Sequence, residues 1–324
     1  MDGYGVTIIA LFGIGLNIIG VFDLLRKKKR KRFFNLLLAT QFFFNLLLLT
    51  TYFIKSLITH FVTIPHEYFS FYPFFVCPVL RWSLSCSILM TVTLAYSRCN
   101  ALENPILHRD SLYTQADRLK DLMKHISPLI ILSIPITLPW FLEFEVESVD
   151  ETENRTPSLF ASHIRLDPIY SLTYIVIFSL VCLVVFPTVA LTYLSIRIYK
   201  AINKDLTLSQ IRVVRSPVTR SVSANTQSFN KKCPNNKIVI MIVIFFLIFS
   251  IPRVVFTVAE VVIQILRLNK PKYEIGCSTE YWLGIVGIVN KLFTVINSSI
   301  HVFLYKSATK FIVKCFNKNV AASV

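Results

Sequence analysis

The sequence predicts an all-α membrane protein, a bundle of seven transmembrane helices with a short amphipathic eighth helix. First, 54% of the 324 residues are hydrophobic, only 16% are charged and the mean hydropathy is +0.60. Second, the apolar residues form stretches that approach or exceed the roughly 20 residues a helix needs to cross a bilayer. Third, basic residues cluster between these stretches, so the net charge of +16 does not indicate nucleic acid. Membrane lipids are the expected surroundings.

Each expected span is nearly free of charge in its centre and is bounded by polar or basic residues. We expect them to form a single domain covering residues 1–324, with an interfacial helix at 306–317. The predicted spans are residues 5–25, 33–56, 70–98, 125–144, 169–197, 237–265 and 281–305.

The charge of the connecting segments predicts the orientation. A run of seven basic residues, Arg26–Arg32, directly follows the first span, and such blocks stay in the cytoplasm. The amino terminus is therefore expected outside a multi-pass protein of the plasma membrane. The acidic 145–167 link falls outside as well, where Asn154 in an N-x-T sequence is a glycosylation candidate, although Pro157 directly after it disfavours use.

Two cytoplasmic segments are expected after the fifth and seventh spans. Residues 205–236 are polar and basic with few large apolar side chains, which predicts a mobile loop. Residues 306–317 alternate lysines with apolar side chains, as in a helix lying in the membrane interface. Within this helix Cys315 is a candidate for palmitoylation.

Polar side chains at membrane depth are candidate functional residues because burying them unpartnered in lipid is costly. Asn17 and Asn45 are expected at mid-membrane depth, where they are predicted to hydrogen-bond to each other. Pro252 is expected to kink the sixth span, since it frees a backbone carbonyl. The seventh span carries a polar seam that must face the bundle interior, formed by Asn290, Lys291, Asn297, Ser298, Ser299 and His301.

Three cations are expected in the outer half of the bundle. Arg81, Arg253 and Lys291 converge there by topology, and three cations in one cavity require an anionic partner. Glu260 and Glu280 are possible internal partners, and a ligand carboxylate is another. The alternative is that these basic side chains extend to the outer interface, as Lys and Arg near helix ends commonly do.

Three residues stand at characteristic positions: Arg98 at the inner end of the third span, Pro252 in the sixth and Tyr305 at the end of the seventh. In these residues the chain resembles the rhodopsin-like G-protein-coupled receptors. The resemblance covers nearly the whole chain, including Asn17 and Pro187. Several motifs depart from the family pattern: Asn45 replaces the sodium-binding Asp, Ser97 and Cys99 flank Arg98, Ser250 replaces the tryptophan of the sixth span, and His301 opens the final motif.

The closest likeness is to the FMRFamide-receptor-like neuropeptide receptors of invertebrates. It rests on residues 72–75 with Pro78, then 87–92, 138–143, 196–200 and 296–299. The resemblance implies an extracellular peptide ligand and a heterotrimeric G protein as partners. It implies ligand contacts at Arg81, Trp82, Arg253, Glu260 and Lys291, and roles in activation and G-protein coupling for Asn17, Asn45, Arg98, Pro187, Pro252, Asn297, His301 and Tyr305.

Several alternatives remain open from the sequence. A small anionic ligand suits the three cations, an atypical or silent receptor suits the altered motifs, and a transporter or channel would line its path with the polar seam. Cys77 and Cys277 either pair or stay free thiols, because residues 144–168 hold no cysteine. Histidine and cysteine spacing predicts neither an enzyme nor a metal site, and no cofactor is expected.

Overall fold

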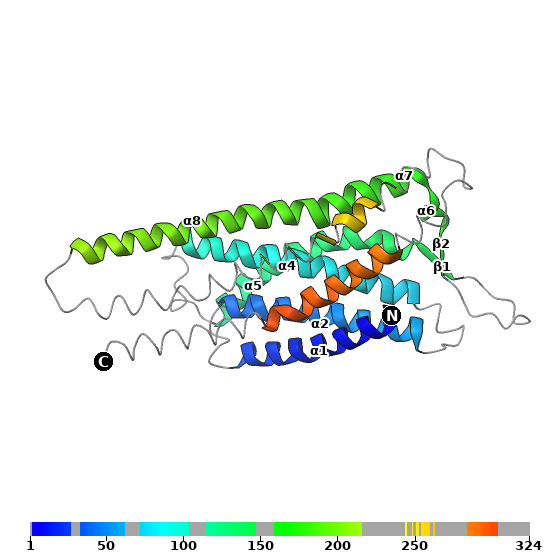
Figure 1. The fold of residues 1–324 in the computed structure, drawn as a ribbon, viewed down its shortest axis with the longest axis horizontal. Coiled ribbons are helices and arrows are strands. Elements are labelled where there is room, and N and C mark those ends of the chain that lie inside the picture. The colour runs from blue at the N-terminus through cyan, green and yellow to red at the C-terminus, as the bar shows by residue number, and fades with distance from the viewer. Residues whose placement is uncertain are drawn as a thin grey trace, which may run out of the picture.

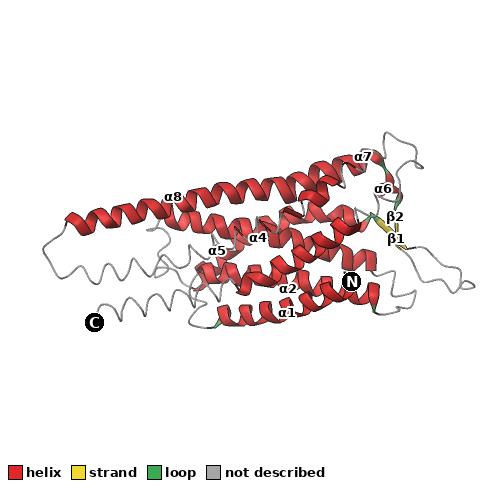
Figure 2. Ribbon diagram, in the orientation of Figure 1, coloured by secondary structure: helices red, strands yellow, loops and turns green. Residues whose placement is uncertain are grey.

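The computed structural model describes residues 2–26, 33–61, 72–103, 115–146, 159–215 and 284–303, and scattered positions between 244 and 262. Most of the described chain is helical (Figures 1 and 2). The long helices are α1 (Asp2–Leu25), α2 (Phe33–His60), α4 (Cys77–Glu103), α5 (Gln115–Thr137), α8 (Phe186–Arg215) and the last helix (Gly284–Phe303). The shorter elements are η1 (Tyr72–Val76), η2 (Leu138–Phe141), β1 (Phe144–Val146), β2 (Leu159–Ala161), α6 (His163–Leu166), α7 (Pro168–Tyr170) and the π-helix η3 (Ser171–Val185).

The long helices lie along a common direction as a bundle (Figure 1). Helix α1 packs on α2, α2 packs on α4, and α4 also packs on α5 and α8. Strands β1 and β2 form an antiparallel pair in which Glu145 lies opposite Phe160. In Figure 1 this pair lies at the end of the bundle where the chain begins.

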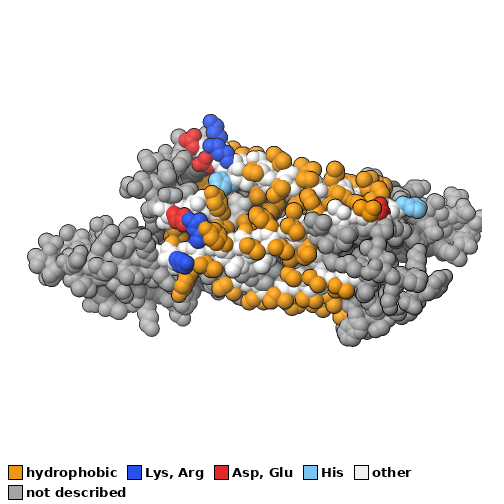
Figure 3. All heavy atoms as spheres, turned by 90° about the horizontal axis from the view of Figure 1, so that it is seen from above, with side chains coloured by type: hydrophobic (Ala, Val, Ile, Leu, Met, Phe, Trp, Pro, Cys, Tyr) orange, Lys and Arg blue, Asp and Glu red, His pale blue; other side chains and the backbone are white. Residues whose placement is uncertain are grey.

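The outward surface of the helices is apolar. Phe12 and Phe22 of α1 are largely exposed, whereas Leu37, Leu48 and Met90 fill the core. In Figure 3 hydrophobic side chains cover the middle of the face shown, and charged side chains gather toward its ends. Among the described residues five helices are long and apolar enough to cross a membrane: Tyr4–Leu25, Phe33–His60, Phe74–Glu103, Leu180–Ala201 and Gly284–Phe303. The chain therefore has the helices of a membrane-embedded protein.

These five helices match the first, second, third, fifth and seventh predicted spans. The fourth predicted span, 125–144, corresponds to α5 and η2, but α5 begins earlier, at Gln115, and the helical turns end at Phe141. Its first half is charged, so α5 is not one of the five apolar helices. Most of the 237–265 span and all of the 306–317 helix lie outside the described residues, and the count of seven spans stays a prediction.

Two features differ from the predictions. Part of the predicted 205–236 loop is helical: α8 continues to Arg215, and the sequence has no glycine or proline between Pro187 and Pro217 that would end the helix earlier. The β1–β2 pair was not expected of an all-α protein; its aromatic and branched residues favour strands and pair through local backbone bonds.

Proline marks the junction of η3 and α8. The N–H of Phe186 bonds to the carbonyl of Val181, five residues back, and ends the π-helix. Pro187 follows, is buried and supplies no N–H. The predicted proline in the fifth span therefore stands where the helical spacing changes.

Candidate functional site

A hydrogen-bond network at the centre of the bundle joins α2, α4 and the last helix through Asn45. The hydroxyl of Ser87 donates to Asn45 Oδ1 at 2.6 Å, and Asn45 Nδ2 donates to Nδ1 of His301 at 3.2 Å. Gln41, one turn before Asn45, donates to the carbonyl of Ser87 at 3.2 Å. All four side chains are buried. Because an amide nitrogen only donates, His301 Nδ1 accepts, and the imidazole is neutral with its proton on Nε2.

Asn17 joins α1 to the same last helix. Its Nδ2 donates to the carbonyl of Gly13 at 2.8 Å and to that of Ser298 at 3.2 Å. The predicted hydrogen bond between Asn17 and Asn45 is therefore wrong. Each asparagine instead reaches the last helix, which packs closely enough on α1 that a Cβ on Gly13 would lie only 2.9 Å from Ser299 Cβ.

Four buried polar atoms around this network have no hydrogen-bond partner in the described part of the chain. They are Asn17 Oδ1, Gln41 Oε1, Asn297 Oδ1 and His301 Nε2. A buried polar atom left unpaired costs about 1–3 kcal/mol. A rearrangement of the last helix that pairs one of these atoms would recover this cost for that atom.

At the end of the bundle where α2 begins, Arg98 lies over an aromatic ring. Its guanidinium carbon is 3.3 Å from the centroid of the Phe34 ring, so α4 contacts the start of α2 through a cation–π interaction. Phe34 is buried, and Arg98 is half-buried.

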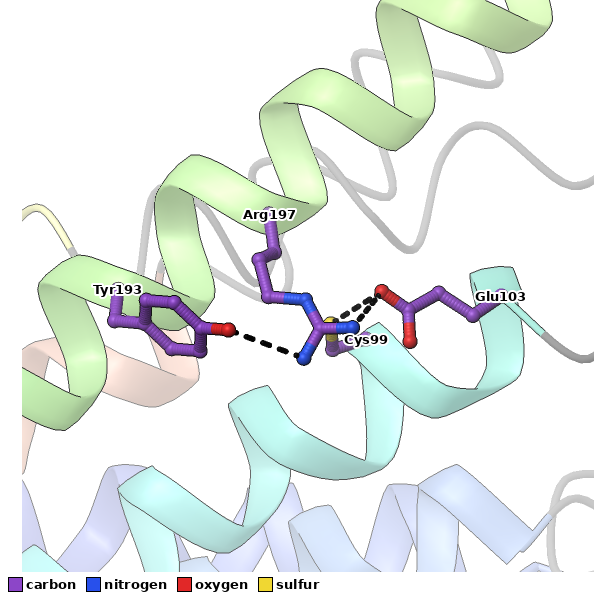
Figure 4. Close-up of polar contacts among 4 residues, drawn as sticks. All are labelled: Cys99, Glu103, Tyr193 and Arg197. Carbon is purple, nitrogen blue, oxygen red and sulfur yellow. Dashed lines mark hydrogen bonds and ion pairs between the residues drawn. The ribbon is translucent and has the colours of Figure 1, made fainter.

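A second contact at this end joins α4 to α8 (Figure 4). Arg197 Nη2 lies 2.5 Å from Glu103 Oε1, and Arg197 Nη1 donates to the Tyr193 hydroxyl at 3.5 Å. The buried thiol of Cys99 also donates to Glu103 Oε1, at 3.6 Å. Sequence reasoning missed this ion pair, because 94 residues separate its partners and no local pattern links them.

At the opposite end of the bundle, the predicted ligand contacts are only partly described. Arg81 and Lys291 are half-buried, and the Trp82 ring packs edge-on against Phe44 at 6.2 Å. Arg253 and Glu260 lie outside the described side chains. The structure therefore neither brings the three predicted cations together nor separates them.

An acidic residue that sequence reasoning did not single out lies at the same end. Glu143 is fully buried, and its Oε1 accepts a hydrogen bond from the Tyr170 hydroxyl at 3.0 Å. The phenol of Tyr174 donates to the carbonyl of Ile136, and its ring stacks on that of Tyr170 with centroids 5.4 Å apart. The available signal was the position of Glu143 at the end of a span, next to a Pro-Trp-Phe sequence.

Of the remaining predicted positions, some are among the described residues and others are not. Pro252 is half-buried, and a little further along the same segment Phe256 contacts Gly287 of the last helix, where an added Cβ would lie 3.2 Å from its ring. Asn154, Tyr305 and Cys315 lie outside the described residues. Cys77 is buried at the start of α4, and Cys277 also lies outside.

The described ranges contain no group of three or more His, Cys, Asp or Glu side chains placed to hold a metal ion. What they contain is a bundle with a neutral polar centre and charged contacts at both ends. No protein-family model matches the chain, and no curated protein matches it either.

Proposed function

We propose that the chain is a G-protein-coupled receptor of the rhodopsin-like type at the cell surface, activated by a neuropeptide resembling FMRFamide. The observation that carries the proposal is the Asn45 network, which joins α2, α4 and the last helix through Ser87 and His301. These are the second, third and seventh predicted spans. Such a link supports transmission between the two sides of the membrane, since a shift of the last helix changes contacts on both neighbours.

The mechanism follows from a two-state equilibrium. A ligand bound at the outer end shifts the population to the extent that it binds one state more tightly. The unpaired atoms of Asn17, Gln41, Asn297 and His301 support a second arrangement of the last helix. Phe256 contacts that helix at Gly287, so its movement would be passed to the segment that contains Pro252.

The inner end would then receive the G protein. The proposed cleft lies beside Arg98, between α4, α8 and the sixth predicted span, and would take the carboxyl-terminal helix of a Gα subunit. In the described state Arg98 is held over Phe34, and Arg197 ties α8 to α4. Opening the cleft would require at least the second of these contacts to loosen.

The experiment is G-protein activation in cells that express the chain, with Phe-Met-Arg-Phe-amide and a neuropeptide library as ligands. We expect a dose-dependent response that disappears in Arg98→Ala while binding of the labelled peptide remains. Lys200→Ala, which removes an exposed cation of α8, serves as the control and should respond like wild type. A protein that reaches the surface but binds none of the peptides would contradict the proposal.

The second candidate is a receptor that binds its ligand without efficient signalling. The contact of Arg98 with the Phe34 ring favours it, because this arginine is held by α2 and has Ser97 and Cys99 as neighbours. Replacing Phe34 by Leu keeps an apolar side chain and removes the ring. If the arginine is held inactive, Phe34→Leu should raise signalling in a protein whose wild type binds peptide silently. No gain would count against this candidate.

A further inference from the structure

The segment around Pro252 presents one apolar face to the outside of the bundle. Six of its described side chains are between 45% and 60% exposed, and they follow one another at intervals of four, three, four, three and four residues. This spacing keeps to one side of an α-helix, both before and after Pro252. The described positions therefore share one rotation about the helix axis. The exposed residues are Ile244, Ile248, Ile251, Val255, Val258 and Val262.

Phe256 points away from this exposed face and contacts the last helix. It follows Pro252 by four residues, is half-buried, and precedes Thr257, which is buried. A Cβ added to Gly287 would lie 3.2 Å from Phe256 Cε2 and 3.9 Å from its Cδ2 and Cζ. The edge of the ring therefore lies against the backbone of the last helix, at a residue whose lack of a side chain permits this close approach.

Gly287 shares a face of the last helix with a predicted ligand contact and with the polar network. Lys291 follows Gly287 by four residues and His301 follows it by 14, which is about one and about four turns of an α-helix. His301 Nδ1 accepts the hydrogen bond from Asn45. A rotation of the last helix about its axis therefore changes the contact with the Phe256 ring and the bond to Asn45 together.

Resting on the receptor function proposed above, we propose that the fit of the Phe256 ring against Gly287 sets how efficiently ligand binding is passed to the G protein, without setting ligand affinity. Phe256 is then a positioning residue: it makes the sixth predicted span follow the last helix. A contact between two side chains can be absorbed by a change of rotamer, whereas the ring here meets backbone, which cannot yield in that way. Displacement of the last helix by a ligand therefore reaches the segment that contains Pro252.

The test uses Phe-Met-Arg-Phe-amide and separates binding, measured without G protein, from the maximal G-protein response per receptor at the surface. Phe256→Leu lacks the ring atoms that reach Gly287, so the response should fall by on the order of fivefold while the dissociation constant stays at the wild-type value. Phe256→Leu/Gly287→Ala returns a methyl group to the gap and should restore most of the response. Phe256→Leu/Gly284→Ala is the matched control: no described atom lies within 4 Å of a Cβ at Gly284, so the response should stay low.

The outcomes separate this inference from the receptor proposal. A Phe256→Leu protein that responds like wild type overturns the inference alone, and so does one whose weaker response follows from weaker peptide binding. Restoration by both alanine substitutions, or by neither, overturns the role of Gly287, since alanine raises helix propensity at either position. Wild type that neither binds the peptide nor activates a G protein overturns the receptor proposal, and the inference with it. If Phe256→Leu does not reach the surface, Phe256→Met, which also lacks the ring, carries the test, and a wild-type response there overturns the inference.

Discussion

Asn45 is the residue on which three helices depend. It accepts from Ser87 on α4 and donates to His301 on the last helix, so its removal leaves a hydroxyl and an imidazole without these bonds in the core. Interhelical hydrogen bonds in membrane proteins contribute only about 0.6 kcal/mol on average. Asn45 makes two such bonds, and its removal leaves buried partners behind. We therefore expect its contribution to the stability to exceed the average for one bond.

We predict that Asn45→Ala lowers the free energy of unfolding by about 1–2 kcal/mol. Thermal unfolding of the protein in detergent micelles would show this as a midpoint several degrees lower. Thr192→Ala is the matched control, because the exposed Thr192 hydroxyl donates only to the carbonyl of Thr188 within its own helix. Equal midpoints for Asn45→Ala and wild type would show that the network does not stabilise the bundle.

The network also shows what residue patterns could and could not predict. Asn17, Asn45 and His301 were identified because polar side chains at membrane depth are costly, and all three are buried in the core. Their partners were not predictable, since the choice between Asn17 pairing with Asn45 or with Ser298 depends on how the helices are rotated. Gln41 carried a usable signal: it precedes Asn45 by four residues and so shares its helix face.

At the scale of elements, α1 contacts its neighbours through glycines. A Cβ on Gly13 would overlap Ser299 Oγ and lie 2.9 Å from Leu49 Cδ1, and one on Gly20 would lie 2.8 Å from the Phe42 ring. Small residues at such positions let helices approach closely in a membrane. Gly15 lies on the same helix, but a Cβ there would have no neighbour within 4 Å.

We predict that Gly13→Val destabilises the protein by about 1–3 kcal/mol, because the larger side chain forces α1 away from α2 and the last helix. Gly15→Val makes the same chemical change toward open space and should unfold close to the wild-type temperature. The comparison uses the thermal midpoint of both variants in one detergent. A similar loss in both would mean that valine acts through helix propensity and not through packing.

The contact between α4 and α8 invites a different prediction, because its ion pair is partly exposed. Side chains of Arg197 and Glu103 are 43% and 35% exposed, and pairs of this kind contribute about 0–1 kcal/mol. Arg197→Gln should therefore change thermal stability little. If the Arg197–Glu103 ion pair holds the proposed G-protein cleft closed, Arg197→Gln should raise ligand-independent signalling.

The charge-swapped variant Glu103→Arg/Arg197→Glu tests the pair itself. It restores the attraction with the partners exchanged, so ligand-independent signalling should fall back toward wild type. Lys200→Gln, an exposed cation in the next turn of α8, is the control for loss of charge. If basal G-protein activation is the same in Arg197→Gln and Lys200→Gln, the ion pair does not hold the proposed cleft closed.

For the whole molecule, the length and position of the apolar helices were largely predictable, because bilayer thickness sets both. Helix α8 extends beyond its predicted end and the β1–β2 pair was not predicted, since bilayer thickness constrains only the apolar stretches of the sequence. The partners of Glu103 and Glu143 were not predictable, because each depends on packing between elements far apart in the sequence. The sequence pattern thus predicted the apolar helices better than the side-chain contacts between them.

Orientation is the whole-molecule prediction that remains to be tested, and it follows from charge. The basic run Arg26–Arg32 lies between α1 and α2, whose facing ends are only a few residues apart, and a short basic link of this kind is retained in the cytoplasm. An amino-terminal epitope tag should therefore bind antibody on intact cells. With an odd number of crossings, a carboxyl-terminal tag should bind only after permeabilisation. Both tags on the same side would require an even number of spans and rule out the seven-helix arrangement, whereas both tags reversed would keep the count and overturn the orientation.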